Sequence, residues 1–392
     1  MKSKTENTGM SVTPSLKKWS LIFVALFFIL WIAVSNFVYV VGVNNGSLSG
    51  AMYPLIEENW DHPRLQKLGF DERLLRVVAD GATEFEKIVM LRGWVHRQWK
   101  GESASFCYPA WDAMEILTLA RNHGNKAFCA QYAIVFLQAC LSIGIPARYV
   151  DLPGHFVVEI WSNDFNKWVV MDPTGDIHFR RDDDVLDGID LCEAYWKDSF
   201  RDIVKVSSDK TRTQIVKEDI GAYRDYSFLV KNNQLTDPMV VTVNGADRKL
   251  VLETDHKKYP YVGRDMVEFT AEILAWDQEG QTEKDSKRKR SNDPSDFRFP
   301  MNQTIIDVLA LNQDKGEVRL GFRGVNSSSF VGFMVMKGNP GIWRESDANM
   351  LYKLKPGMNK FSCRIKSRFG RLGKIASIKL YYKANWLKRP KD

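Results

Sequence analysis

The sequence predicts an α+β protein in which a helix that bears a cysteine packs on an antiparallel sheet, followed by an all-β, sandwich-like C-terminal region. Two observations predict the first part. Apolar residues recur at helical spacing after Cys129, and alternating strand patterns follow at 155–161 and 168–172. A third observation predicts the second part, because short alternating segments separated by Gly, Asn, Asp or Pro recur from Met239 onward. The 392 residues suffice for about two or three domains.

The N-terminal segment predicts a membrane anchor. Residues 1–18 form a polar tail that contains lysines, and no charge interrupts the chain from Trp19 to Val43. This run, 19–43, exceeds the ~20 residues that a bilayer-spanning helix needs, and the lysines precede it. We therefore expect a single-pass signal-anchor helix with a cytoplasmic N-terminus and an extracytoplasmic remainder. A cleaved signal peptide is the alternative, because residues 47–51 offer a weak cleavage site.

Residues 44–237 are expected to form the α+β domain with its flanking segments. A capping box at Thr83–Glu86 predicts a helix that continues to about Trp99. A second short helix is expected around 112–121, before the break at Asn122–Gly124. Both helices precede the cysteine in the chain.

The helix after Cys129 is the best-defined element of this domain. Its apolar positions recur at helical spacing, at Ala130, Ala133, Ile134, Leu137 and Leu141. Gly144 and Pro146 then end the helix. Cys129 therefore lies at a helix N-terminus, where the positive end of the helix dipole and unpaired backbone N–H groups favour a thiolate.

A β-hairpin is predicted downstream of this helix. Residues 155–161 alternate with a period of two, turn residues follow at 162–167, and residues 168–172 return as a second strand. Trp161 is expected to lie opposite Trp168.

That register brings two polar side chains near each other. His155 would lie opposite Thr174, and Asp172 would be its diagonal neighbour on the same face, at roughly 7 to 8 Å. A histidine held by a carboxylate and presented to Cys129 is the arrangement that thiol acyl transfer needs. The imidazole takes the thiol proton, and the carboxylate fixes its tautomer and steadies the imidazolium.

These residues resemble the core of the transglutaminase-like superfamily, whose fold is papain-like. In that superfamily the catalytic cysteine opens a helix, the histidine follows a glycine at a strand start, and the aspartate closes the next strand before a proline. The matching positions are Cys129, His155 after Gly154, and Asp172 before Pro173; Gly144–Arg148 and Trp168 match as well. The resemblance covers roughly residues 80 to 180 and implies a Cys129–His155–Asp172 catalytic triad in a membrane-anchored protein of bacterial type.

The resemblance implies acyl transfer on peptide or protein amides. Hydrolysis of a protease-like kind is slightly favoured over transamidation, because Asp151 and Glu159 cannot be assigned as an amine-binding pair. The backbone N–H of Cys129 is the natural first oxyanion donor, and Trp111, Tyr108 and Gln131 are candidates for the second. The alternative function is a non-catalytic envelope scaffold or binding protein that retains the fold.

Cysteine and histidine spacing predicts no metal site and no cofactor, since neither CxxC nor HxxxH occurs. Besides the nucleophile, four cysteines are available for disulfides in an extracytoplasmic setting: Cys107, Cys140, Cys192 and Cys363. Four cysteines allow three sets of pairings, and the sequence does not choose among them.

The C-terminal strands are expected to form two small β units, at 238–295 and 296–392. The first ends in a polar stretch whose basic cluster, Lys287–Arg290, is interpreted as a solvated surface loop. The net charge of +7 is spread through the chain, so no nucleic-acid partner is expected.

A cell-envelope glycan or protein is a candidate partner of the C-terminal β region, although a β-sandwich fold by itself implies neither. Exposed aromatic residues would mark a sugar-binding face, and the candidates are Tyr381, Tyr382 and Trp386. Edge packing is the favoured interpretation for them.

Overall fold

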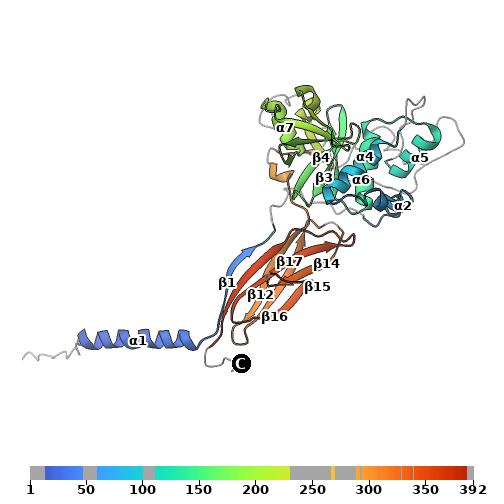
Figure 1. Ribbon diagram of the computed structural model, residues 1–392. Coiled ribbons are helices and arrows are strands. Elements are labelled where there is room, and N and C mark those ends of the chain that lie inside the picture. The colour runs from blue at the N-terminus through green and yellow to red at the C-terminus, as the bar shows by residue number, and fades with distance from the viewer. Residues whose placement is uncertain are drawn as a thin grey trace, which may run out of the picture.

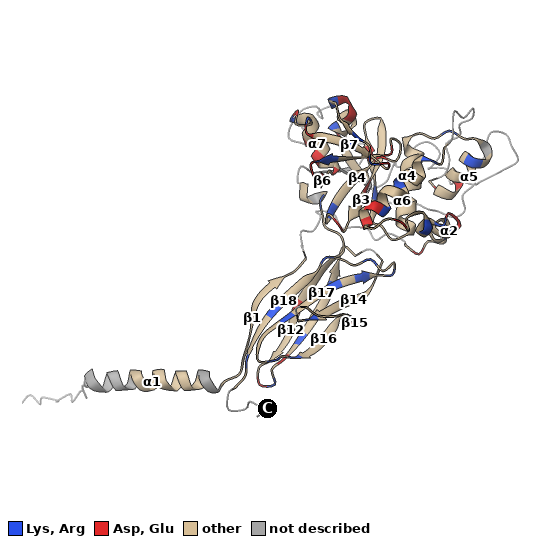
Figure 2. Ribbon diagram, in the orientation of Figure 1, with Lys and Arg blue, Asp and Glu red and all other residues tan. Residues whose placement is uncertain are grey.

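A computed structural model describes residues 14–46, 60–99, 111–229, 266–269, 288–291, 294–327, 329–338 and 340–385. It contains an N-terminal helix, an elongated β-sandwich, and a domain of helices and sheets at the far end of the sandwich (Figure 1). Basic and acidic residues are interspersed along both domains (Figure 2). The predicted fold class, an α+β core with an antiparallel C-terminal region, is confirmed.

The α+β domain is built around helix α6 (Cys129–Ser142). Around it pack helices α2 (Pro63–Asp71), α4 (Glu84–His96) and α5 (Ala113–His123), with the short α3 (Leu74–Val77) between α2 and α4. The predicted N-terminus of α4 is confirmed, because the Thr83 hydroxyl accepts a hydrogen bond from the N–H of Glu86 (3.1 Å). Almost every residue of α6 after Cys129 is buried, so the helix forms the centre of the domain core.

One face of α6 packs on a six-stranded sheet in the order β11-β10-β9-β2-β3-β4. Its strands are β2 (Ala147–Leu152), β3 (His155–Ser162), β4 (Lys167–Met171), β9 (Tyr226–Leu229), β10 (Met266–Phe269) and β11 (Arg288–Ser291). All neighbours pair antiparallel except β10 and β11.

A four-stranded sheet, in the order β6-β5-β7-β8, completes the domain. Its strands are β5 (Ile177–Arg181), β6 (Asp184–Val185), β7 (Ile203–Ser207) and β8 (Arg212–Gln214). Helix α7 (Gly188–Trp196) and the 3₁₀ helix η1 (Lys217–Arg224) lie in the same part of the chain and contact each other.

The sandwich packs a five-stranded sheet, β1-β18-β17-β14-β15, on a three-stranded sheet, β12-β13-β16. Its strands are β1 (Phe37–Asn44), β12 (Gln303–Asn312), β13 (Glu317–Val325), β14 (Phe330–Lys337), β15 (Trp343–Ser346), β16 (Asn349–Lys353), β17 (Gly357–Ser367) and β18 (Ala376–Lys383). Alternate side chains of both sheets fill one core, with Leu320 and Phe333 as examples from each.

The expected helix from Trp19 to Val43 is wrong after Val34. Helix α1 (Pro14–Val34) ends at Val34, and the following residues form β1, which pairs with β18. The break lies at Ser35 and Asn36. The Ser35 hydroxyl donates to the carbonyl of Trp31, and the Asn36 side chain accepts the N–H of Asn385 from the other end of the chain. Residues 37–43 are mostly β-branched or aromatic, which suits a strand. Within the part of the chain that the structure describes, no helix has the length and apolarity of a membrane span.

The expected separate β unit at 238–295 is also corrected. Its two described strands, β10 and β11, extend the sheet of the α+β domain instead. Part of the basic cluster expected in a solvated loop, Arg288–Arg290, lies in the edge strand β11. Charged residues are common on edge strands, where they discourage pairing with other chains. Two other predicted strands, 239–243 and 249–253, lie outside the described residues.

Candidate functional site

Helix α6 places Cys129 at its first position. The preceding residue, Phe128, is extended, and its N–H donates to Oε1 of Gln131 (2.8 Å). This contact fixes the chain at the start of the helix, as the reciprocal half of a capping box does. Cys129 is partly exposed, whereas the rest of α6 is buried in the domain core. The thiol is therefore accessible from solvent and is positioned by a well-packed helix.

A tight turn places His155 at the start of β3. Pro153 and Gly154 connect β2 to β3, and Leu152 pairs with His155 across the turn. Gly154 has φ +73°, which glycine adopts without strain after a proline in such a turn. About a quarter of the His155 side chain, 26%, remains exposed.

A turn at the end of β4 positions Asp172. Trp161 does lie opposite Trp168, as predicted, but the β3–β4 ladder ends at Val158 and Met171. The predicted pairing of His155 with Thr174 is therefore wrong. The chain turns back at Asp172, which exchanges backbone hydrogen bonds with Ile177 (2.9 and 3.0 Å).

The two side chains nevertheless meet, because Asp172 Oδ2 lies 2.8 Å from His155 Nε2. The other oxygen of the carboxylate, Oδ1, accepts the N–H groups of Thr174 (2.8 Å) and Gly175 (3.2 Å). Both oxygens are thus engaged, which fixes the direction in which the carboxylate points.

His155 is also hydrogen-bonded to Cys129. Because Asp172 occupies Nε2, the nitrogen left to face the thiol is Nδ1. Burial by itself lowers the pKa of His155, but the hydrogen bonds to Asp172 and Cys129, together with their charges, outweigh it and raise the pKa to about 10. An imidazolium between a carboxylate and a sulfur is therefore favoured, and the structure brings the three predicted residues into one chain of contacts.

Two of the three candidates for the second oxyanion donor are described. Trp111 and Gln131 are buried, and Nε1 of Trp111 and Nε2 of Gln131 have no hydrogen-bond partner among the described residues. Gln131 belongs to the same helical turn as Cys129, whereas Trp111 packs on the ring of Tyr149 (4.7 Å). Tyr108 lies outside the described residues.

Sequence reasoning missed the residues that support the Asp172 turn. Arg92 and His96 on α4 bond to the segment 173–176 that follows Asp172. The signal for Arg92 was available in the sequence, because it interrupts the apolar stripe of Ile88 and Val95. A charge in such a stripe requires a buried partner.

The described cysteines are all free thiols: Cys129, Cys140, Cys192 and Cys363. The last three are buried, and burial raises the pKa of each, which makes them poor nucleophiles. The sequence left the disulfide pairing open, and the structure has no disulfide among these described cysteines; Cys107 lies outside the described residues. No cluster of metal-binding side chains occurs within the described ranges.

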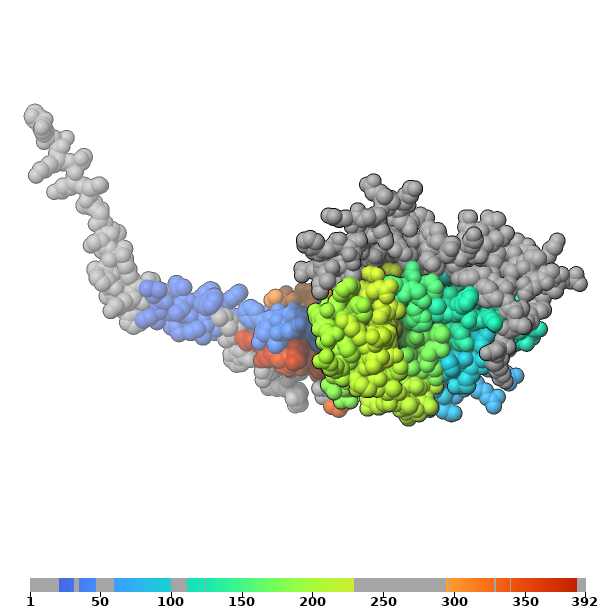
Figure 3. Space-filling model, turned by 90° about the horizontal axis from the view of Figure 1, so that it is seen from above, coloured from blue at the N-terminus to red at the C-terminus, as the bar shows by residue number. Residues whose placement is uncertain are grey.

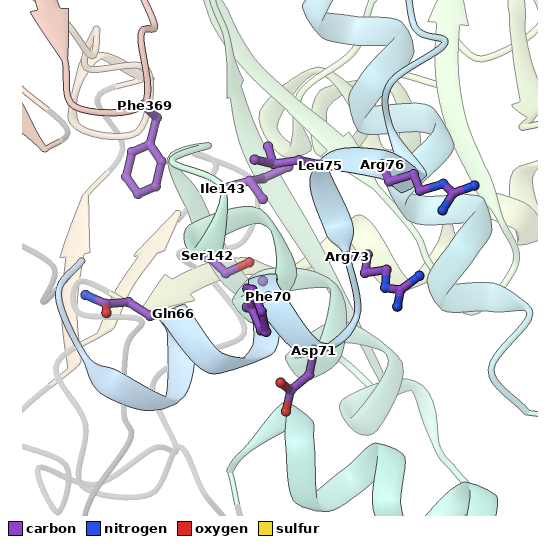
Figure 4. A pocket seen from close by; sticks show the side chains of 10 residues that line it. Gln66, Phe70, Asp71, Arg73, Leu75, Arg76, Ser142, Ile143 and Phe369 are labelled. Carbon is purple, nitrogen blue, oxygen red and sulfur yellow. The ribbon is translucent and has the colours of Figure 1, made fainter.

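A groove of about 740 Å³ lies at the opposite end of α6 from Cys129. Figure 4 shows Leu75, Ile143 and Phe369 together at one side of it, with Arg73 and Arg76 farther along. None of the predicted catalytic residues lines this groove, so its size does not bear on the chemistry at Cys129.

Two of the C-terminal aromatic residues pack on the protein itself. Tyr382 is buried in the sandwich core, and the ring of Tyr381 stacks on Tyr39 of β1 (5.3 Å). Trp386 lies outside the described residues. These contacts favour edge packing over an exposed sugar-binding face.

Residues 72–173 match the model of the transglutaminase-like superfamily. The matched segment begins between α2 and α3 and includes Cys129, His155 and Asp172. No curated protein matches the chain.

Proposed function

We propose that this protein is a cysteine-dependent acyl-transfer enzyme, because residues 72–173 match the model of the transglutaminase-like superfamily. In this proposal Cys129 is the nucleophile, His155 the general base and acid, and Asp172 the residue that orients His155. The observation that carries the proposal is the environment of one imidazole, which has Asp172 at Nε2 and a hydrogen bond to Cys129.

The proposed reaction begins from the pair of imidazolium and thiolate, in which the thiol proton already lies on His155. Cys129 Sγ then attacks the carbonyl carbon of an amide. The resulting oxyanion accepts a hydrogen bond from the backbone N–H of Cys129. This N–H is free to donate because the first N–H groups of a helix have no acceptor within the helix. The imidazolium then gives its proton to the leaving nitrogen, the C–N bond breaks, and a thioester remains on Cys129. In the second half-reaction His155 deprotonates the acceptor, which attacks the thioester and regenerates the thiol.

Water is the acceptor that we favour. One of the two acidic residues considered for an amine site, Glu159, is fully buried and engaged by Arg148 (2.7 Å), by the N–H of Gly188 (2.7 Å) and by the hydroxyl of Tyr226. It is therefore committed to the domain core. This supports hydrolysis of a peptide or protein amide over transfer to an amine.

One incubation tests this function and the acceptor together. The protein is mixed with a glutamine-containing peptide and a labelled primary amine, and the products are analysed by mass. Ammonia release or chain cleavage that is lost in Cys129→Ala supports hydrolysis. Amine incorporation that depends on Cys129 would replace hydrolysis by transamidation, and an unreactive Cys129 toward a thiol-directed electrophile at neutral pH would favour the scaffold alternative.

Attachment to a membrane through the N-terminal segment belongs to the same proposal. Helix α1 extends away from both domains in two perpendicular views (Figures 1 and 3). The large apolar side chains between Leu21 and Trp31 are 47–72% exposed and lie on all sides of the helix. Alkaline extraction of membranes from cells that make the full chain should leave it in the membrane, and external protease should digest it. Release of the protein into the soluble fraction would contradict the proposed membrane anchor. Protection of the chain from external protease would contradict the proposed extracytoplasmic orientation.

A further inference from the structure

Arg92 is a buried cation that points at the turn behind Asp172. It lies on α4 with its side chain fully buried. Its Nε donates to Oδ1 of Asp176 (2.9 Å), and its Nη2 donates to the backbone carbonyl of Asp176 (3.0 Å). One arginine thus holds both the side chain and the main chain of a single residue, in the forked geometry that guanidinium groups provide.

Asp176 closes the turn that Asp172 opens. The backbone bonds between Asp172 and Ile177 join the two ends, and Asp176 has φ +51°, a left-handed conformation that aspartate adopts more readily than most L-residues in turns. The second oxygen of Asp176 accepts a hydrogen bond from the hydroxyl of Ser208. The turn is therefore tied to α4 and to the segment after β7.

The remaining donors of Arg92 are also occupied within the protein. Its Nη1 lies 2.9 Å from Nδ1 of His178 and donates to the sulfur of Met171 (3.3 Å). Burial, and then the charge of Arg92, lower the pKa of His178 to about 2, so its ring is neutral and accepts from the guanidinium. The second N–H of Nη2 donates to the backbone carbonyl of Val206 (3.4 Å). Asp176 is the carboxylate that pairs with Arg92, and with all five N–H groups engaged no donor remains for a substrate.

A second contact from α4 supports the same turn. Nδ1 of His96 lies 3.0 Å from the carbonyl of Thr174 and 3.3 Å from that of Pro173. The His96 ring also lies near Tyr132, in the first turn of α6 (6.3 Å between centroids). Helix α4 thus touches both the turn of Asp172 and the helix of Cys129.

We propose that Arg92 is a positioning residue for the reaction, and that it acts by holding the Asp172–Asp176 turn so that the Asp172 carboxylate points at His155. The inference rests on the proposed function. Arg92 touches no reacting atom, so its effect must pass through Asp172. Because a misplacement of about 1 Å lowers rates by about 10²-fold, replacing the fork by the single ammonium of lysine should have a large effect on turnover.

The experiment is a double-mutant cycle on turnover with Arg92→Lys and Asp172→Asn. Arg92→Lys should lower kcat by about 10- to 100-fold and leave KM nearly unchanged. In the Asp172→Asn background the same substitution should change kcat less than about 2-fold, because the residue through which it acts has been removed. Equal factors in both backgrounds would overturn the proposal.

Alkylation of Cys129 by iodoacetamide as a function of pH gives a readout that does not need a substrate. Arg92→Lys should shift this profile toward that of Asp172→Asn even if no amide substrate is turned over, which separates failure of this inference from failure of the proposed function. A folded Arg92→Lys protein with the wild-type profile would overturn the inference.

Arg148→Lys is the matched control, since Arg148 is a buried arginine of the same domain that pairs with Glu159 and, within the described part of the chain, makes no hydrogen bond or ion pair with the turn. It should retain the wild-type alkylation profile, and an equal shift in both lysine variants would overturn a specific role for Arg92. If Arg92→Lys does not fold, Asp176→Asn replaces it. This variant keeps an acceptor for Arg92 while removing the charge, and it should shift the profile in the same direction by a smaller amount. An unchanged profile would count against the proposal.

Discussion

Arg371 in the segment between β17 and β18 of the sandwich pairs with Glu84 in the first turn of α4 (2.5 Å). Burial lowers the pKa of Arg371, and the Glu84 carboxylate opposes that effect. Glu84 also accepts hydrogen bonds from the backbone and side chain of Asn163 in the α+β domain (2.9 and 3.1 Å). The two domains thus share a partly buried ion pair at the N-terminal end of the helix that supports the Asp172 turn.

Removing one member of this pair should destabilise the protein. Arg371→Met leaves the Glu84 carboxylate without its partner, and we expect a loss of about 2 kcal/mol in the free energy of unfolding. This is less than the value for a fully buried pair, because 12% and 18% of the two side chains remain exposed. Urea unfolding measures it. The double variant with Glu84→Gln should lose less than the sum of the two single losses, and strict additivity would contradict the coupling.

A side chain at Gly144 should destabilise the protein for two reasons, backbone strain and a clash with a neighbouring ring. It has φ +76°, and a Cβ there would lie 2.2 Å from the ring of Phe369, which comes from the sandwich. Gly370 has φ +75° but open space around it, which makes it the matched control. Gly370→Ala should cost about 1 kcal/mol from the left-handed conformation alone, and Gly144→Ala should cost at least about 1 kcal/mol more.

Adding Phe369→Ala should reduce the difference between these two glycine variants, because it removes the ring that the new methyl group meets. The free energy of unfolding, from thermal or urea unfolding, is compared for Gly144→Ala and Gly370→Ala, each with and without Phe369→Ala. Equal losses of unfolding free energy in Gly144→Ala and Gly370→Ala would mean that Phe369 of the sandwich does not pack closely against the C-terminal end of α6.

Three single substitutions separate the roles within the proposed triad. Cys129→Ala should abolish turnover, His155→Ala should do nearly the same, and Asp172→Ala should leave more activity. In comparable enzymes losing the nucleophile or base lowers kcat by about 10⁶-fold, and losing the orienting carboxylate by about 10⁴-fold. Steady-state kinetics measures the order. Turnover that survived in Cys129→Ala and disappeared in Cys140→Ala or Cys192→Ala would contradict the assignment.

Local signals in the sequence predicted the core of the α+β domain well. The start of α6, the capping of α4 and the Trp161–Trp168 register each depend on residues that are close in the chain. Turn residues and hydrophobic spacing encode such features directly.

Contacts between distant segments were not predictable in this way. The run from Phe37 to Val43 is apolar and suits either a helix or a strand, and only its hydrogen bonds to β18, near the other end of the chain, decide for the strand. Arg92 likewise gains its role from Asp176, which lies on another element. The same holds for β10 and β11, whose place in the sheet depends on β9.

The protonation of His155 should make stability depend on pH in one direction. Burial alone would lower its pKa, but hydrogen bonds to Asp172 and Cys129 raise it from 6.5 to about 10. A group whose pKa is raised in the folded state binds its proton more tightly there than in the unfolded chain. Its stabilising contribution is therefore complete below pH 6.5 and is lost as the pH rises from 6.5 through about 10.

Urea unfolding of the wild type and of His155→Gln at a series of pH values across this window isolates the contribution. The difference in the free energy of unfolding between the two proteins should be most favourable to the wild type at the acidic end and should decline steadily toward the alkaline end. Asp172→Asn removes the first of the two hydrogen bonds that raise the pKa, so in that background the decline should be complete at a lower pH. A difference that grew with pH would mean that the folded protein does not hold His155 in its protonated form.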